Sequence, residues 1–70
     1  MPPEYTEKVA EILHDLDSRG LAGVRRSSYG LHPLRGDLAG HWAVRVSANW
    51  RITFRPDGKD VYDVDLVDYH

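Results

Sequence analysis

The 70-residue chain contains no cysteine and one phenylalanine, and its longest run of apolar residues is three positions, Trp42 to Val44. The absence of cysteine excludes disulfide frameworks, thiolate metal sites and cysteine nucleophiles. Such short apolar runs do not form a membrane-spanning helix, and the start Met1-Pro2-Pro3-Glu4 lacks a signal-peptide pattern. We therefore expect a cytoplasmic protein without membrane association, folded as one domain over residues 1–70 with a thin core.

Charge is unevenly distributed along the chain, although the formal net charge is only −2. Residues 1–17 carry −4, residues 18–55 carry +6 and residues 56–70 carry −4, and every cation of the middle segment is an arginine. A basic face made of arginine is suited to a phosphate backbone. Pairing of these arginines with the C-terminal aspartates across strands would explain the same pattern without a ligand.

The first part of the chain has the pattern of an amphipathic helix. Counted from Tyr5, apolar residues recur at positions i, i+4, i+7, i+8 and i+11, which places them on one stripe of a helix. Arg19 followed by Gly20 is typical of a helix end. The spacing predicts a helix over Pro3 to Arg19.

The rest of the chain has the pattern of a small antiparallel sheet. A short strand is expected around Ser28 to His32, and three longer strands in meander order follow, separated by turns at residues 47–49 and 56–59. Apolar residues alternate with polar ones along these three strands, and we expect them to form the surface that receives the helix: Trp42, Val44, Val46, Trp50, Ile52, Phe54, Tyr62, Val64 and Leu66. The fold class predicted is α+β, with the N-terminal helix packed on a small antiparallel β-sheet.

The opposite face of this sheet is predicted to be charged, with Arg45, Arg51, Arg55, Asp63 and Asp65. The two tryptophans are interpreted as core anchors rather than as platforms for nucleobases.

The polar residues suit phosphodiester cleavage in RNA without a metal ion. The sequence has no glycine-rich phosphate loop, nucleophile elbow or metalloprotease motif, and we expect neither an organic cofactor nor a bound metal. RNA carries its own nucleophile, the 2′-hydroxyl, so cleavage needs a base, an acid and cationic hydrogen-bond donors for the phosphate. Histidine and arginine supply these groups, and the candidates are His32, Arg35, Arg51 and the C-terminal triplet Asp68-Tyr69-His70.

Three motifs resemble a known family. Residues 31–42 read LHPLRGDLAGHW, residues 47–54 read SANWRITF, and the chain ends in Asp68-Tyr69-His70. In this order they resemble the HigB toxins of the RelE/ParE superfamily. The resemblance implies a RelE-like fold and a type II toxin–antitoxin toxin, a ribosome-dependent endoribonuclease that cuts mRNA in the ribosomal A site and halts translation. Its neutralising partner would be a HigA-like helix-turn-helix antitoxin.

The resemblance also implies roles for individual residues. His32 and His70 are expected to share the acid–base work, while Asp68 and Tyr69 orient them. Arg51 follows Asn-Trp as in the family and is expected to stabilise the phosphate, together with Arg35 and Arg45. Arg35 stands where many members have lysine, which keeps the charge and changes the donor geometry.

The resemblance leaves one structural expectation and two alternatives. Family members begin with a strand and a helix ahead of the region matched by residues 3–19, so we expect this chain to expose a surface that a second copy could cover. In the first alternative, the chain is a catalytically inactive short form that binds an antitoxin or RNA. A gyrase poison of the ParE kind is disfavoured, because the terminal Asp-Tyr-His triplet belongs to the ribonuclease branch.

Overall fold

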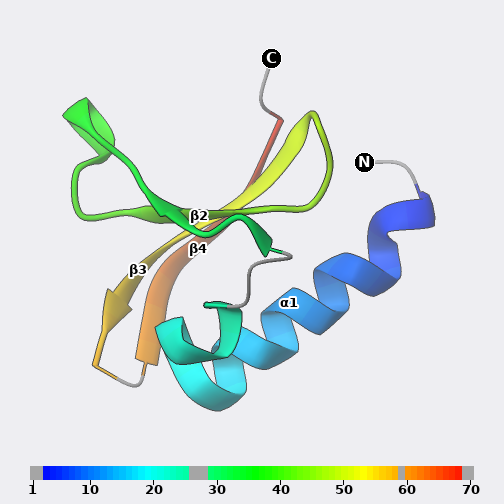
Figure 1. Ribbon diagram of the computed structural model, residues 1–70, viewed down its shortest axis with the longest axis horizontal. Coiled ribbons are helices and arrows are strands. Elements are labelled where there is room, and N and C mark those ends of the chain that lie inside the picture. The colour runs from blue at the N-terminus through cyan, green and yellow to red at the C-terminus, as the bar shows by residue number, and fades with distance from the viewer. Residues whose placement is uncertain (1–2, 26–28, 59, 69–70) are drawn as a thin grey trace.

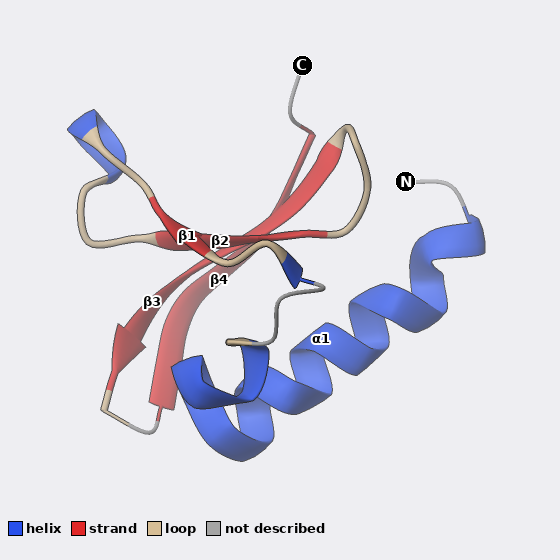
Figure 2. Ribbon diagram, viewed as in Figure 1, coloured by secondary structure: helices blue, strands red, loops and turns tan. Residues whose placement is uncertain are grey.

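The computed structural model describes residues 3–25, 29–58 and 60–68 and shows two layers, a helix below a twisted antiparallel sheet (Figure 1). A 3-10 helix, η1 (Pro3–Tyr5), leads into α1 (Thr6–Arg19) and a second 3-10 helix, η2 (Gly20–Val24). The strands are β1 (His32–Pro33), β2 (Trp42–Arg45), β3 (Trp50–Asp57) and β4 (Asp60–Asp68), and a short 3-10 helix, η4 (Gly36–Leu38), lies between β1 and β2 (Figure 2). The α+β class predicted from the sequence is confirmed.

The predicted N-terminal helix is confirmed over its whole length as η1 followed by α1. Ile12 and Leu16 on its apolar stripe are buried. The helix ends at Gly20, which has a φ of +62° and donates its N–H to the carbonyl oxygen of Leu16. Among the described residues, no helix combines the length and the apolar character needed to cross a membrane.

The sheet has four strands in the order β1-β2-β3-β4, all antiparallel. The three predicted long strands form the meander, and the expected short strand is present as β1, which pairs with β2 at His32 and Pro33. Of the segment predicted for it, residues 28–32, only His32 belongs to β1; residues 29–31 are not in a strand, and Ser28 lies outside the described residues. We call the face of the sheet toward α1 the helix-side face and the other the site face.

The core lies between α1, η2 and the helix-side face. Phe54, Ile52 and Val44 are fully buried on the two central strands, and Trp42 and Trp50 pack against this cluster at its margin. The interpretation of the tryptophans as core anchors is therefore confirmed. The buried apolar residues of the described chain are Ile12, Leu16, Val24, Tyr29, Ala43, Val44, Val46, Ile52 and Phe54.

Three predictions for the core are wrong, because Tyr62, Val64 and Leu66 of β4 are exposed, and a β-bulge in β4 accounts for Tyr62. Thr53 pairs with Asp65 and Arg55 pairs with Tyr62, so two residues of β4, Asp63 and Val64, oppose one residue of β3. An extra residue reverses the alternation of side chains along the strand. Tyr62 therefore lies on the site face rather than in the core, with 44% of its surface exposed, and Val61 packs against the core instead.

Gly23 allows η2 to pack directly on α1. A Cβ atom at this position would lie 2.3 Å from the carbonyl oxygen of Asp15, which is backbone and cannot rotate away. We expect Gly23→Ala to lower the free energy of unfolding by about 1–3 kcal/mol, because η2 and Val24 must move away from the helix. Urea denaturation measures this loss. Ala22→Ser in the same 3-10 helix is the control, and equal stability of the two variants would contradict the packing described.

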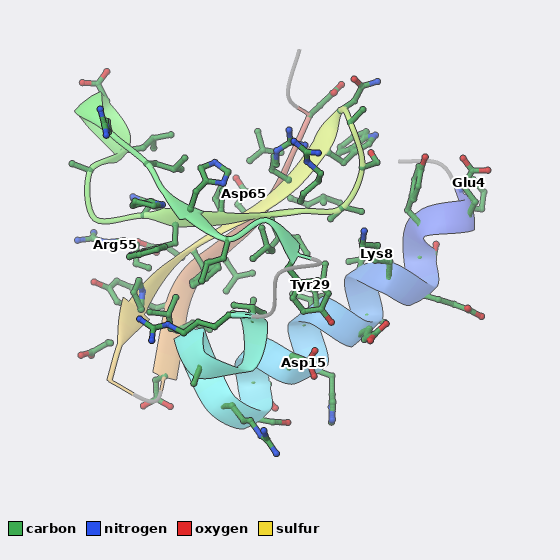
Figure 3. The ribbon with its side chains drawn as sticks, in the orientation of Figure 1. Glu4, Lys8, Asp15, Tyr29, Arg55 and Asp65 are labelled. Carbon is green, nitrogen blue, oxygen red and sulfur yellow. The ribbon has the colours of Figure 1, made fainter. Side chains whose placement is uncertain are left out.

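Tyr29 joins the segment after η2 to α1 (Figure 3). Its side chain is buried and donates a hydrogen bond to Asp15 Oδ2 at 2.8 Å, with Glu11 Oε1 at 3.4 Å. Burial, followed by the hydrogen bond and the negative charge of Asp15 and then those of Glu11, raises the pKa of Tyr29 to about 12 from its usual 10.0. The protonated hydroxyl therefore stabilises the folded chain.

We expect Tyr29→Phe to reduce the free energy of unfolding at pH 7 by about 1–2 kcal/mol. Because the folded-state pKa is raised, this contribution is complete below about pH 10 and is lost as the pH rises towards 12. Urea titrations of both proteins between pH 7 and 12 should show their difference narrowing only above pH 10. A difference in the free energy of unfolding that stays constant from pH 10 to pH 12 would contradict the hydrogen bonds assigned to the Tyr29 hydroxyl.

Candidate functional site

A cavity of about 760 Å³ lies on the site face of the sheet. All four strands and the loop between β1 and β2 contribute to its walls. The lining residues are His32, Leu34, Arg35, Leu38, His41, Ala43, Arg45, Arg51, Thr53, Asp63, Val64, Asp65 and Val67.

The strand register arranges the floor of the cavity in two rows. In the first row, His32 pairs with Ala43, Ala43 with Thr53, and Thr53 with Asp65. The small side chains of Ala43 and Thr53 leave the middle of this row low, between a histidine on one edge strand and a carboxylate on the other. The neighbouring row contains Arg45 and Arg51, which are direct cross-strand partners. The cavity thus combines a titratable ring with two guanidinium groups on one surface.

His32 is exposed, and its ring orientation is fixed by a backbone contact. Its Nδ1 lies 2.9 Å from the carbonyl oxygen of Gly30. A carbonyl oxygen only accepts hydrogen bonds, so Nδ1 must carry the proton and donate it. In the neutral ring the lone pair then resides on Nε2, which is the arrangement that a general base requires.

Arg51 is held by the β2–β3 turn. Its Nη1 donates to the carbonyl oxygens of Ser47 at 2.5 Å, Trp50 at 3.2 Å and Ala48 at 3.3 Å. These carbonyls fix the guanidinium group beside the cavity before any ligand binds. A preorganised cation loses little side-chain entropy when an anion arrives.

Arg45 and Arg51 face each other across β2 and β3 on the site face. Cross-strand partners have Cβ atoms about 5 Å apart, and like charges in such pairs destabilise a sheet. An anion between the two guanidinium groups would convert this repulsion into two charge-assisted interactions. The pair is therefore arranged for phosphate or another oxyanion.

Arg45 makes no ion pair with an aspartate among the described residues. Among the described residues one ion pair is present, Arg55 with Asp63 at 4.0 Å, and both side chains are largely exposed. Asp65 accepts the N–H of Leu66 at 2.9 Å through Oδ1. The interpretation of the charge pattern as cross-strand Arg–Asp pairing accounts for Arg55 and not for Arg45.

The structure brings four of the predicted site residues together and separates a fifth from them. His32, Arg35, Arg45 and Arg51 line the cavity. Asp68 is the cross-strand partner of Trp50 at the end of β4, and it is not among the lining residues. Tyr69 and His70 lie outside the described residues.

Two lining residues, His41 and Thr53, were not predicted to belong to an RNA site. His41 immediately precedes Trp42, so the alternation that buries Trp42 places His41 on the site face, and this alternation was the available signal. Within residues 3–25, 29–58 and 60–68, no group of three or more histidine, aspartate or glutamate side chains is positioned to hold a metal ion.

Comparison with known proteins identifies one relative. The chain is 38% identical over 71 residues to Endoribonuclease HigB of Proteus vulgaris, and the match covers 100% of this chain and 77% of that protein. No family model matches the chain.

The repulsion between the like charges of Arg45 and Arg51 leads to a stability prediction that does not depend on activity. Arg45→Gln should raise the free energy of unfolding at low ionic strength by about 0.5 kcal/mol, because it removes one of two like charges. The gain should shrink in 1 M salt, which screens the repulsion. Urea denaturation at both salt concentrations measures it, with Arg25→Gln as the control at an exposed arginine outside the cavity. A loss of stability at low salt would contradict the repulsion.

Proposed function

The chain belongs to the HigB family of toxin endoribonucleases, and from this membership we propose that it cuts mRNA in the A site of translating ribosomes without a metal ion. The observation that carries the proposal is the cavity on the site face, where His32 with a fixed tautomer lies among Arg35, Arg45 and Arg51. A base and several phosphate ligands on one surface are what cleavage through the RNA 2′-hydroxyl requires.

In the proposed reaction, Nε2 of His32 takes the proton of the 2′-hydroxyl, and the 2′-oxygen attacks the adjacent phosphorus. The bond from phosphorus to the 5′-oxygen breaks, and an acid protonates that oxygen, leaving a 2′,3′-cyclic phosphate and a 5′-hydroxyl. We assign the acid to His70, and the orientation of the His70 imidazole to Asp68 and Tyr69, which precede it in the chain.

The arginines stabilise the negative charge that develops on the phosphate during the proposed reaction. The attack places additional negative charge on the phosphate oxygens, and guanidinium groups remain charged throughout the reaction. Arg51 is fixed by the turn carbonyls, and Arg45 lies opposite it, so two donors converge on one anion. Arg35, on the loop after β1, reaches the same cavity from its rim. Such preorganised cations stabilise a transition state more than the ground state that precedes it.

The proposed partners are the ribosome with its mRNA and a HigA-like helix-turn-helix antitoxin. The open edge strand β4 carries Asp60, Asp63, Asp65 and Asp68. Like charges oppose the pairing of this edge with its copy in a second chain. We therefore propose the antitoxin, rather than a second copy, as the protein that this side of the molecule binds.

The proposal is tested by mapping cuts in mRNA by primer extension during translation in vitro, with the untagged 70-residue chain. His32→Ala and a chain lacking His70 should each lose cleavage by about 10²- to 10⁴-fold, the usual contribution of a general acid or base. His14→Ala is the matched control, because His14 is an exposed histidine on α1 far from the cavity in the fold. The same mRNA without ribosomes should remain intact.

Two results would overturn the proposal. Cuts that persist in the His32 variant would remove the assigned base. A folded wild-type chain that binds RNA and leaves mRNA intact on ribosomes would favour the alternative, a catalytically inactive module that binds RNA or an antitoxin.

A further inference from the structure

Tyr62 is an aromatic side chain on the wrong face for a core residue. Its sequence position continues the apolar alternation of β4, yet the bulge at Asp63 and Val64 places it on the site face beside Arg55. It is 44% exposed there. A tyrosine that contributes little to the core, on the face that carries the cavity, needs another explanation.

The bulge that exposes Tyr62 is held by a strained backbone. Asp63 has a φ of +53°, and it is the only residue other than glycine with a positive φ in the described part of the chain. This conformation is unfavourable for a residue with a side chain, and such outliers gather at functional positions. Both bulge residues, Asp63 and Val64, line the cavity. The strain is therefore located where the cavity meets Tyr62.

The guanidinium group of Arg55 lies over the face of the Tyr62 ring, and the two side chains form one stacked surface. The guanidinium carbon of Arg55 lies 5.2 Å from the centre of the Tyr62 ring, a cation–π contact. Asp63 holds the other side of the guanidinium through the ion pair at 4.0 Å. An aromatic ring next to an arginine is the combination on which single-stranded nucleic acids stack their bases.

Polar atoms near this surface lack partners. In the described residues, Nδ1 of His41 and Nε of Arg55 are buried and make no hydrogen bond. His41 precedes Trp42 and Arg55 follows Phe54, and Trp42 and Phe54 are cross-strand partners, so His41 and Arg55 occupy neighbouring positions on the site face. Buried polar atoms are normally satisfied, and unsatisfied ones point to a missing ligand.

The stacking surface lies in line with the phosphate site. Along β3, Arg51, Thr53 and Arg55 all face the site side, and two residues of a strand span about 6.6 Å. Arg55 and Tyr62 are therefore about 13 Å from the Arg45–Arg51 row by strand geometry. An RNA strand with a phosphate at the arginines would place a base from a neighbouring nucleotide near Tyr62.

We propose that Tyr62 and Arg55 form a stacking platform for one unpaired nucleobase of the RNA, about 13 Å from the arginine pair that binds the cleaved phosphate, and that Nδ1 of His41 binds the edge of that base. The proposal rests on the proposed function, because its ligand is the single-stranded mRNA. Base recognition then lies on the site face beside the cavity, toward the end of β3 away from the arginine pair, since neither Arg55 nor Tyr62 lines the cavity itself. The β-bulge places Tyr62 on the site face, where this platform lies.

The test measures the binding of a short single-stranded RNA whose 2′-hydroxyls are all methylated, so that it cannot be cut. By fluorescence anisotropy, Tyr62→Ala should weaken binding about tenfold, Tyr62→Leu should do the same, and Tyr62→Phe should retain it, because the aromatic face is required. Leu66→Ala, a similarly exposed change on the other face of β4, is the matched control and should bind as the wild type does. Circular dichroism verifies that each variant is folded.

A second arm removes single bases from the RNA, one position at a time. At one position the missing base should weaken binding to the wild type about tenfold and have no further effect on Tyr62→Ala, since both changes remove the same stack. Equal binding by wild type and Tyr62→Ala, or independent effects at every position, would overturn the platform.

Primer extension on translating ribosomes separates this proposal from the proposed function. A wild type that cuts, with Tyr62→Ala unchanged in RNA binding and cutting, overturns the platform and leaves the nuclease. A wild type that does not cut while RNA binding still depends on Tyr62 supports the platform and overturns the nuclease. A folded wild type that neither binds nor cuts RNA overturns both.

Discussion

Burial of a single sheet face against one helix is the constraint on which the rest of the molecule depends. Seventy residues provide one layer of buried side chains between α1 and the strands, centred on Phe54, Ile52 and Val44. With a core this thin, the two central strands must keep their large apolar residues on the helix side. The other face is then released from packing and is available for charged residues, which is where the cavity lies.

The same strands therefore have two different physical tasks at adjacent positions. On β3, Ile52 and Phe54 are buried while Arg51, Thr53 and Arg55 face the cavity side, and this division follows from the two-residue period of a strand. The rigid core holds the arginines in place, although their mutual repulsion opposes it. A binding surface with unfavourable internal electrostatics is what a polyanionic ligand can relieve. The packing of Ile52 and Phe54 on the helix-side face thus holds the arginines of the site face in position.

The sequence allowed the helix, the β2–β3 hairpin and much of the site to be predicted, because each rests on a regular period or on the chemistry of a side chain. Arg45 and Arg51 lie on strands whose faces follow from that period, whereas His32 and Arg35 were proposed from side-chain chemistry and from the resemblance to the HigB toxins. Tyr62 was assigned to the wrong face, since the apolar alternation continues unbroken through a bulge, and residue types alone do not report an extra residue. His41 was not predicted, because it precedes β2, which begins at Trp42. The short pairing of β1, two residues long, depends on tertiary contacts that no local pattern encodes.

The number of residues in β4 also decides which of its side chains lie on the site face. Between Thr53 and Arg55 the partner strand contains one residue more than a regular ladder allows. Deleting either Asp63 or Val64 would restore the regular ladder and leave Tyr62 opposite Arg55 and Val61 opposite Pro56, each on the face that it has now. When related chains are aligned, a one-residue gap at this point therefore preserves the inner and outer faces of the strand, whereas a strand of equal length without a bulge exchanges them between the bulge and the turn. An alignment scored on amino-acid identity alone would miss which side chains of β4 lie on the helix-side face and which lie on the site face.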